Sequence, residues 1–120
     1  MTEEDVLAFI RASISSVWAL ELLLLLKRNE RRSWRANELV TELRSSSTAI
    51  KDALGVLRTA GVVGEENGLY RYQPASPALD EMIVEVAKVY ALKPLVVVKT
   101  IAMAPNEKLR IFANSFKLKE

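Results

Sequence analysis

The sequence contains neither cysteine nor histidine, and these two absences exclude many kinds of functional site. No disulfide forms, no cysteine nucleophile exists, and no side chain titrates near neutral pH without a large pKa shift. Zinc, copper and iron–sulfur centres lose their usual ligands, so only carboxylate-based binding of hard cations stays open. The paired carboxylates are adjacent in sequence, and adjacent residues do not face each other on a helix. We therefore predict no enzymatic activity, no metal site and no cofactor.

Long apolar runs are also missing. The most apolar stretch, residues 17–26, is about ten residues long and is interrupted by Glu21, whereas a membrane span needs roughly 20 apolar residues. Residues 1–5 are acidic, whereas a signal peptide begins with basic residues. These features predict a cytoplasmic protein that does not cross a membrane.

The 120 residues are half apolar and 27% charged, which is typical of one folded globular domain. The 17 basic and 15 acidic residues give a formal charge of only +2, so net charge is a weak argument for nucleic-acid binding. The distribution is more informative, because residues 27–35 hold five basic residues and one acidic residue. Such a cluster attracts a polyanion through counterion release, although a solvated loop is the alternative explanation.

Apolar residues recur at helical spacing through the first half of the chain. Thr2 predicts the start of a first helix that ends near Ser13. Residues 17–27 form a helix that is apolar on almost every face, which we place in the middle of the core or beneath another chain. A short helix over residues 37–43 and an amphipathic helix over residues 47–60 follow, separated by a serine-rich turn.

The next segment predicts a small β-hairpin. Two short strand-like runs flank Asn67-Gly68, a strong two-residue turn signal, since both residue types tolerate a positive φ. Ser76 and Pro77 then predict the N-cap and the first position of a long helix. Further helices are expected from Pro94 to residue 103 and around residues 109–116, which contain Leu109, Ile111, Phe112 and Phe116.

The order helix, short helix, serine-rich turn, helix, glycine, hairpin resembles the winged helix-turn-helix regulators of the MarR and ArsR type. The resemblance extends over residues 34–72, about a third of the chain. It implies a single mainly helical domain over residues 1–120, with a winged-helix core at 14–74, a small β-hairpin wing, and helical extensions at 1–13 and 75–120. The residues that carry the pattern are Leu39, Leu43, Ile50, Ala53, Leu54, Leu57, Ala60, Gly61, Val62 and Val63.

The resemblance further implies a sequence-specific transcriptional regulator that binds double-stranded DNA as a homodimer, with the helix 47–60 in the major groove. The terminal helices then bury their apolar stripes against a second copy, or alternatively against the same chain. Metal sensing through thiolates or imidazoles is excluded, and any effector stays unidentified. The candidate DNA contacts, from the resemblance and from the basic stretch, are Arg31, Arg32, Arg35, Ser46, Ser47, Thr48, Lys51 and Arg71.

Several acidic residues favour a protein partner instead. Asp52 stands where such helices often carry arginine, and Glu65 and Glu66 flank the tip of the hairpin, where they repel DNA. Gly55 offers no side chain for base contacts. The alternative function is therefore a winged-helix protein–protein interaction module that does not bind DNA.

Overall fold

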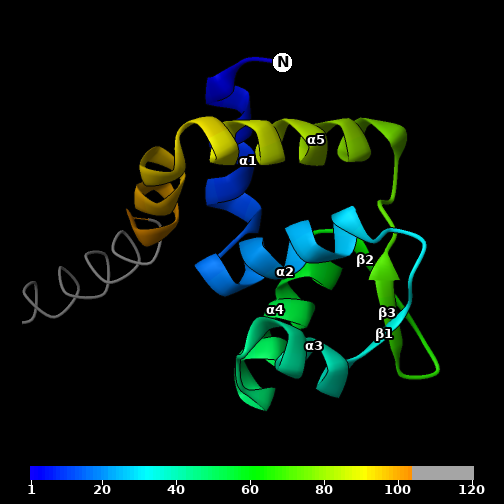
Figure 1. Cartoon of the computed structure of the whole chain (residues 1–120). Helices are drawn as coiled ribbons and strands as arrows, with labels where there is room; N and C mark the ends of the chain where they lie inside the picture. Colours follow the sequence, from blue (N-terminus) through cyan, green and yellow to red (C-terminus); the bar gives the residue numbers. More distant parts are fainter. Residues whose placement is uncertain (104–120) are drawn as a thin grey trace, which may run out of the picture.

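Helices form most of the chain in the computed structural model, which describes residues 1–103 (Figure 1). A three-stranded antiparallel sheet accompanies them. The helix expected around residues 109–116 lies outside the described residues. In chain order the elements are α1 (Glu3–Ser13), α2 (Val17–Arg28), β1 (Trp34–Arg35), α3 (Ala36–Leu43), α4 (Ser47–Thr59), β2 (Val63–Glu66), β3 (Leu69–Tyr72), α5 (Pro77–Leu92) and a further helix, Pro94–Met103.

Four helices begin at a hydroxyl cap. The side chains of Thr2, Ser16, Ser46 and Ser76 each accept a hydrogen bond, at 3.0–3.1 Å, from the backbone N–H three residues later. Such caps satisfy one of the otherwise unpaired amides of the first turn. The predicted starts at Thr2 and at Ser76 are confirmed, and the serine-rich turn supplies the cap of α4.

Both α3 and α4 end at a residue in the left-handed conformation. Gly61, with φ +80°, donates to Arg58 O, while Val62 donates to Leu57 O. Arg44, with φ +52°, occupies the equivalent position after α3, and Ser45 donates to Val40 O. This paired hydrogen-bond pattern stops a helix sharply. It lets α4 follow α3 after a short turn and lets the chain leave α4 directly into β2.

The sheet has the strand order β1-β3-β2. Trp34 pairs with Tyr70, and Glu66 pairs with Leu69 across the hairpin. The two turn residues, Asn67 and Gly68, both have positive φ, as the sequence predicts. The described residues therefore form a mostly helical protein with a β-hairpin to which one short strand is added.

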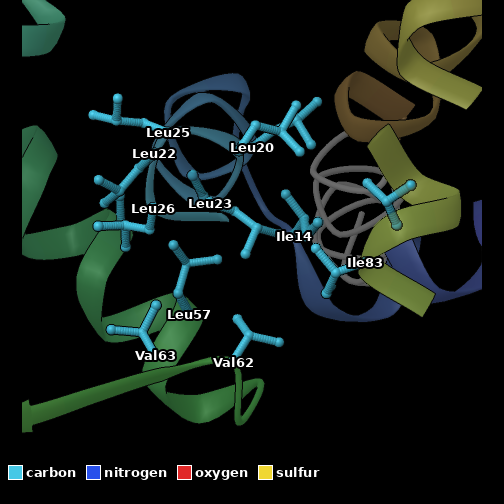
Figure 2. Close-up of a cluster of buried hydrophobic side chains, with 14 of the residues drawn as sticks. Ile14, Leu20, Leu22, Leu23, Leu25, Leu26, Leu57, Val62, Val63 and Ile83 are labelled. Atoms are coloured by element: carbon cyan, nitrogen blue, oxygen red, sulfur yellow. The ribbon is translucent and has the colours of Figure 1, made fainter. Parts of the chain in front are cut away.

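The leucines of α2 form the centre of the core. Leu20, Leu22, Leu23 and Leu26 are fully buried. Figure 2 shows their side chains spread around the helix, some toward Leu57 of α4 and others toward Ile14 and Ile83. The predicted central helix is confirmed, except at its first turn, where Val17 and Trp18 are 37% and 42% exposed.

The terminal helices pack on the core of their own chain. Val6 and Ile10 of α1 and Ile83 of α5 are buried, and α1 lies against α5 in Figure 1. Lys93 pairs with Glu3 at 2.8 Å. The apolar stripes that we expected to face a second copy are thus largely covered within one chain, because α2 and α4 leave an open core face that α1 and α5 fill.

Within residues 1–103, no single helix has the length and apolar character needed to cross a membrane. By length and composition alone, α1 and α2 reach that threshold together, but the pair is bent by 112°.

Candidate nucleic-acid interface

The α4 helix has one buried and one exposed face. Ile50, Ala53, Leu54 and Leu57 lie in the core. The opposite face, at the N-terminal end of the helix, is open to solvent in the part of the chain that the structure describes. Its exposed residues are Ser47, Thr48, Lys51, Asp52 and Gly55. The amphipathic spacing that the sequence displays therefore places three of the candidate contact residues, Ser47, Thr48 and Lys51, on one accessible surface.

Ser46 has a structural role at the start of this surface. Its hydroxyl accepts the backbone N–H of Ala49 at 3.1 Å, which fixes the first turn of α4. Ser46 is exposed, but its side-chain oxygen is already engaged as an acceptor. This arrangement holds Ser47 and Thr48 at the exposed end of the helix, where the partial positive charge of the dipole favours an anion.

The basic stretch after α2 divides among three environments. Arg31 is exposed in the loop and borders a shallow concavity of about 350 Å³ together with Arg28 and Arg32. The guanidinium of Arg32 instead stacks on the ring of Trp34, 3.5 Å from its centroid, and pairs with Glu38 at 3.4 Å. Arg32 is therefore partly committed to holding the buried Trp34 and the first turn of α3.

Arg35 and Arg71 belong to the sheet. Arg35 in β1 is exposed, and its backbone N–H donates to Glu38 Oε1 at 2.8 Å, which anchors the start of α3. Arg71 in β3 is exposed beside a surface hollow of about 380 Å³ that Glu65 and Glu66 also line. The charge of Arg71 is consequently offset by carboxylates on the same hairpin.

The structure groups the candidate residues in two places. The loop from α2 to β1 runs beside the sheet at the right of Figure 1, whereas the turn from α3 to α4 lies at the lower left. Arg31, in the loop after α2, and Lys51, on α4, therefore belong to different elements. No single helix or strand therefore carries a continuous positive surface that includes both residues.

A polar cluster that sequence reasoning missed joins three elements. Lys27 of α2 lies 3.2 Å from Asp80 Oδ1 of α5, and Tyr72 of β3 donates to the same oxygen at 2.6 Å. The hydrogen bonds from Tyr72 and Lys27 lower the pKa of Asp80. Burial and the neighbouring Asp80 raise the pKa of Tyr72. The three residues are far apart in sequence, so no local sequence pattern predicts the cluster.

A second feature that the sequence does not announce is a groove between α2 and α4. It encloses about 320 Å³. Its lining residues are Ser15, Ser16, Trp18, Ala49, Asp52, Ala53 and Val56. Among the described residues, no group of three acidic side chains is placed to hold a metal ion.

Comparison of the chain with protein-family models, with curated proteins and with solved structures found no match.

Proposed function

We propose that this protein is a DNA-binding transcriptional regulator of the winged helix-turn-helix type that acts in the cytoplasm as a homodimer. The observation that carries the proposal is the exposed N-terminal face of α4. Ser47, Thr48 and Lys51 offer hydroxyl and ammonium groups to base edges or phosphates. The same helix is held rigidly from behind by four buried apolar side chains.

The surroundings of α4 support this role. The capped turn between α3 and α4 fixes two helices against each other, and only residues 60–62 separate α4 from the β2–β3 hairpin. In this interpretation α4 is the recognition helix and the hairpin is the wing. Arg35 and Arg71 would then contribute contacts to phosphates next to the groove that α4 enters.

A set of exposed apolar residues supports the homodimer. Leu92 and Leu95 are 81% and 73% exposed where α5 meets the following helix, and Val96 and Met103 are exposed on that helix. An apolar surface of this kind is typical of a protein–protein contact. A two-fold dimer built there would present two copies of α4 to one DNA duplex.

Selection from a random duplex library at low salt, followed by fluorescence anisotropy on the selected duplex, tests DNA binding directly. Lys51→Gln is expected to weaken binding and to reduce the slope of log affinity against log salt by about 1, since one phosphate or base contact is lost.

Arg11→Gln is the control, because Arg11 is also exposed and carries the same charge but lies on α1, outside the apolar set assigned to the dimer. It should leave affinity and salt slope unchanged if that helix stays away from the DNA. Failure to select any duplex, or equal effects of the two variants, contradicts recognition by α4. Light scattering of Leu95→Glu tests the dimer, which is expected to dissociate.

The second candidate function is a winged-helix interaction module that binds protein instead of DNA. It is favoured by exposed carboxylates on the surfaces that DNA would approach, namely Asp52 on α4 and Glu65 and Glu66 on the hairpin. A partner that co-purifies after nuclease treatment, and is lost from the Glu65→Gln/Glu66→Gln variant, would support this function. If the protein binds the selected duplex and the double variant keeps its protein partners, this second function is contradicted.

A further inference from the structure

The groove between α2 and α4 combines an aromatic ring, a carboxylate and an apolar floor. Trp18 contributes from the first turn of α2, and Asp52 contributes from the second turn of α4. Ala49, Ala53 and Val56 supply the apolar part of the lining. The volume of about 320 Å³ is in the lower range of pockets that hold small molecules.

Trp18 lies with Val17 in the first turn of α2, where both side chains are exposed. It is 42% exposed, whereas the following residues of the helix, from Ala19 onward, are mostly buried. The other tryptophan, Trp34, is only 3% exposed and is already stacked with Arg32. Trp18 has no such cation among the described residues, so its indole remains accessible to a ligand.

Among the described residues, Asp52 is the only charged one that lines the groove. It is exposed, and no lysine or arginine of residues 1–103 lies within ion-pair distance of it. Helix α2 begins at the same groove, and the partial positive charge of its first turn opposes a cation. The full negative charge of Asp52 exceeds that partial charge, so the groove as a whole favours a positive ligand.

We propose that this groove is a binding site for a small organic cation, of the ammonium or guanidinium class. The positive group lies between the indole of Trp18 and the carboxylate of Asp52, and the aliphatic part of the ligand packs on Ala53 and Val56. Indole is the aromatic group that best attracts a cation. A carboxylate within the same groove adds charge and a hydrogen-bond acceptor.

The site has a consequence for gene control, and this part of the inference rests on the proposed function. Asp52 stands one residue from Lys51 on the exposed face of α4, where its negative charge repels the phosphates of DNA. A bound cation neutralises that charge. The ligand therefore strengthens DNA binding, and Asp52→Asn produces the same strengthening without ligand.

Cation binding is tested without DNA, so that its outcome is independent of the proposed function. The full chain is titrated with choline chloride while the indole N–H signals of its two tryptophans are followed by NMR. Parallel titrations use dimethylbutanol, the neutral carbon isostere of choline, and sodium chloride at equal ionic strength. We expect a saturable shift of the Trp18 signal with choline alone, and the buried Trp34 signal serves as an internal reference.

Two variants separate the site from a general charge effect. Asp52→Asn removes the groove carboxylate and is expected to weaken choline binding about fivefold, the upper range for an exposed ion pair. Glu42→Gln removes another exposed carboxylate, from α3 and outside the groove, and should bind choline as the unchanged protein does. Both changes are at exposed positions, and circular dichroism verifies that both proteins are folded.

Equal responses to choline and dimethylbutanol, unchanged binding by Asp52→Asn, or shifts of both tryptophan signals would overturn the cation site. Absence of DNA binding beside intact choline binding would leave the site standing and remove only its link to gene control. Choline binding that leaves DNA affinity unchanged would remove that link as well.

Discussion

The phenol of Tyr72 donates to Asp80 Oδ1 across 2.6 Å, and the same carboxylate oxygen accepts the ammonium of Lys27 at 3.2 Å. The ammonium also lies 5.0 Å from the centre of the Tyr72 ring. These contacts connect the end of β3, the first turn of α5 and the last turn of α2. The cluster therefore fixes the direction in which α5 leaves the sheet and crosses the core.

The first prediction concerns the Tyr72 hydroxyl. Tyr72→Phe keeps the buried ring and its contact with Lys27 but removes the hydrogen bond to Asp80. We expect the free energy of unfolding to fall by about 1 kcal/mol, the ordinary net value of one hydrogen bond, because the Asp80 side chain is 40% exposed and partly screened. Urea denaturation measures the change. Tyr70→Phe, at a half-buried tyrosine of the same strand, is the control, and an equal loss there would contradict a specific role for Tyr72.

The second prediction concerns the dependence of stability on pH. Hydrogen bonds from Tyr72 and Lys27 lower the pKa of Asp80 in the folded protein. The stability that the charged Asp80 contributes is therefore present above its unfolded pKa of about 4 and is lost as the pH falls through the folded pKa. Asp80→Asn lacks this contribution. Its stability deficit relative to the unchanged protein should shrink between about pH 5 and pH 2, as measured by denaturation at each pH.

The second prediction extends to alkaline pH through the same cluster. Burial, followed by the hydrogen bond to Asp80, raises the pKa of Tyr72, so the folded protein keeps the phenol protonated where the unfolded chain releases its proton. Partial burial lowers the pKa of Lys27, but the hydrogen bond and the charge of Asp80 outweigh it and raise that pKa overall. Both contributions are lost as the pH rises above about 10, so the unchanged protein should lose stability there more steeply than Tyr72→Phe. Equal slopes for the two proteins would be inconsistent with this assignment.

Much of the fold could be predicted because its signals are local. Asn67-Gly68 specifies its hairpin turn through two positive φ angles, and Ser76 with Pro77 marks the start of α5. In each case the information lies within a few residues of the structure that it determines.

The candidate site could be predicted only in part, because surfaces depend on how elements pack. The exposed face of α4 follows from helical periodicity alone. The partners of Arg32, the groove beside Trp18 and the contact between Lys27 and Asp80 each join segments that are distant in sequence or depend on a side-chain orientation. The periodicity of α2 could not show that its first turn extends past the core and leaves Trp18 accessible.

The third prediction compares two glycines that receive the same substitution. Gly61 has φ +80°, a backbone conformation that strains any residue with a Cβ, although the nearest atom, the Cβ of Ala75, would be at an ordinary contact distance of 3.5 Å. Gly55 is in the middle of α4, and a Cβ there meets nothing within 4 Å. Gly61→Ala should destabilise the protein by about 1–2 kcal/mol, whereas Gly55→Ala should stabilise it by about 1 kcal/mol. Thermal denaturation of both variants shows whether each stability change is a loss or a gain. A loss of stability in Gly55→Ala would show that the helix is constrained at that residue.

The fourth prediction compares two neighbouring arginines in the loop after α2. The guanidinium of Arg32 stacks on Trp34 and pairs with Glu38, whereas Arg31 makes no ion pair within residues 1–103. Arg32→Ala should therefore lower the free energy of unfolding by about 0.5–1 kcal/mol, the value of an exposed cation–π contact, and shift the fluorescence of Trp34. Arg31→Ala should leave both unchanged. Because the two variants remove the same charge from adjacent positions, a matching loss of stability in both would point to general electrostatics and not to the stack on Trp34.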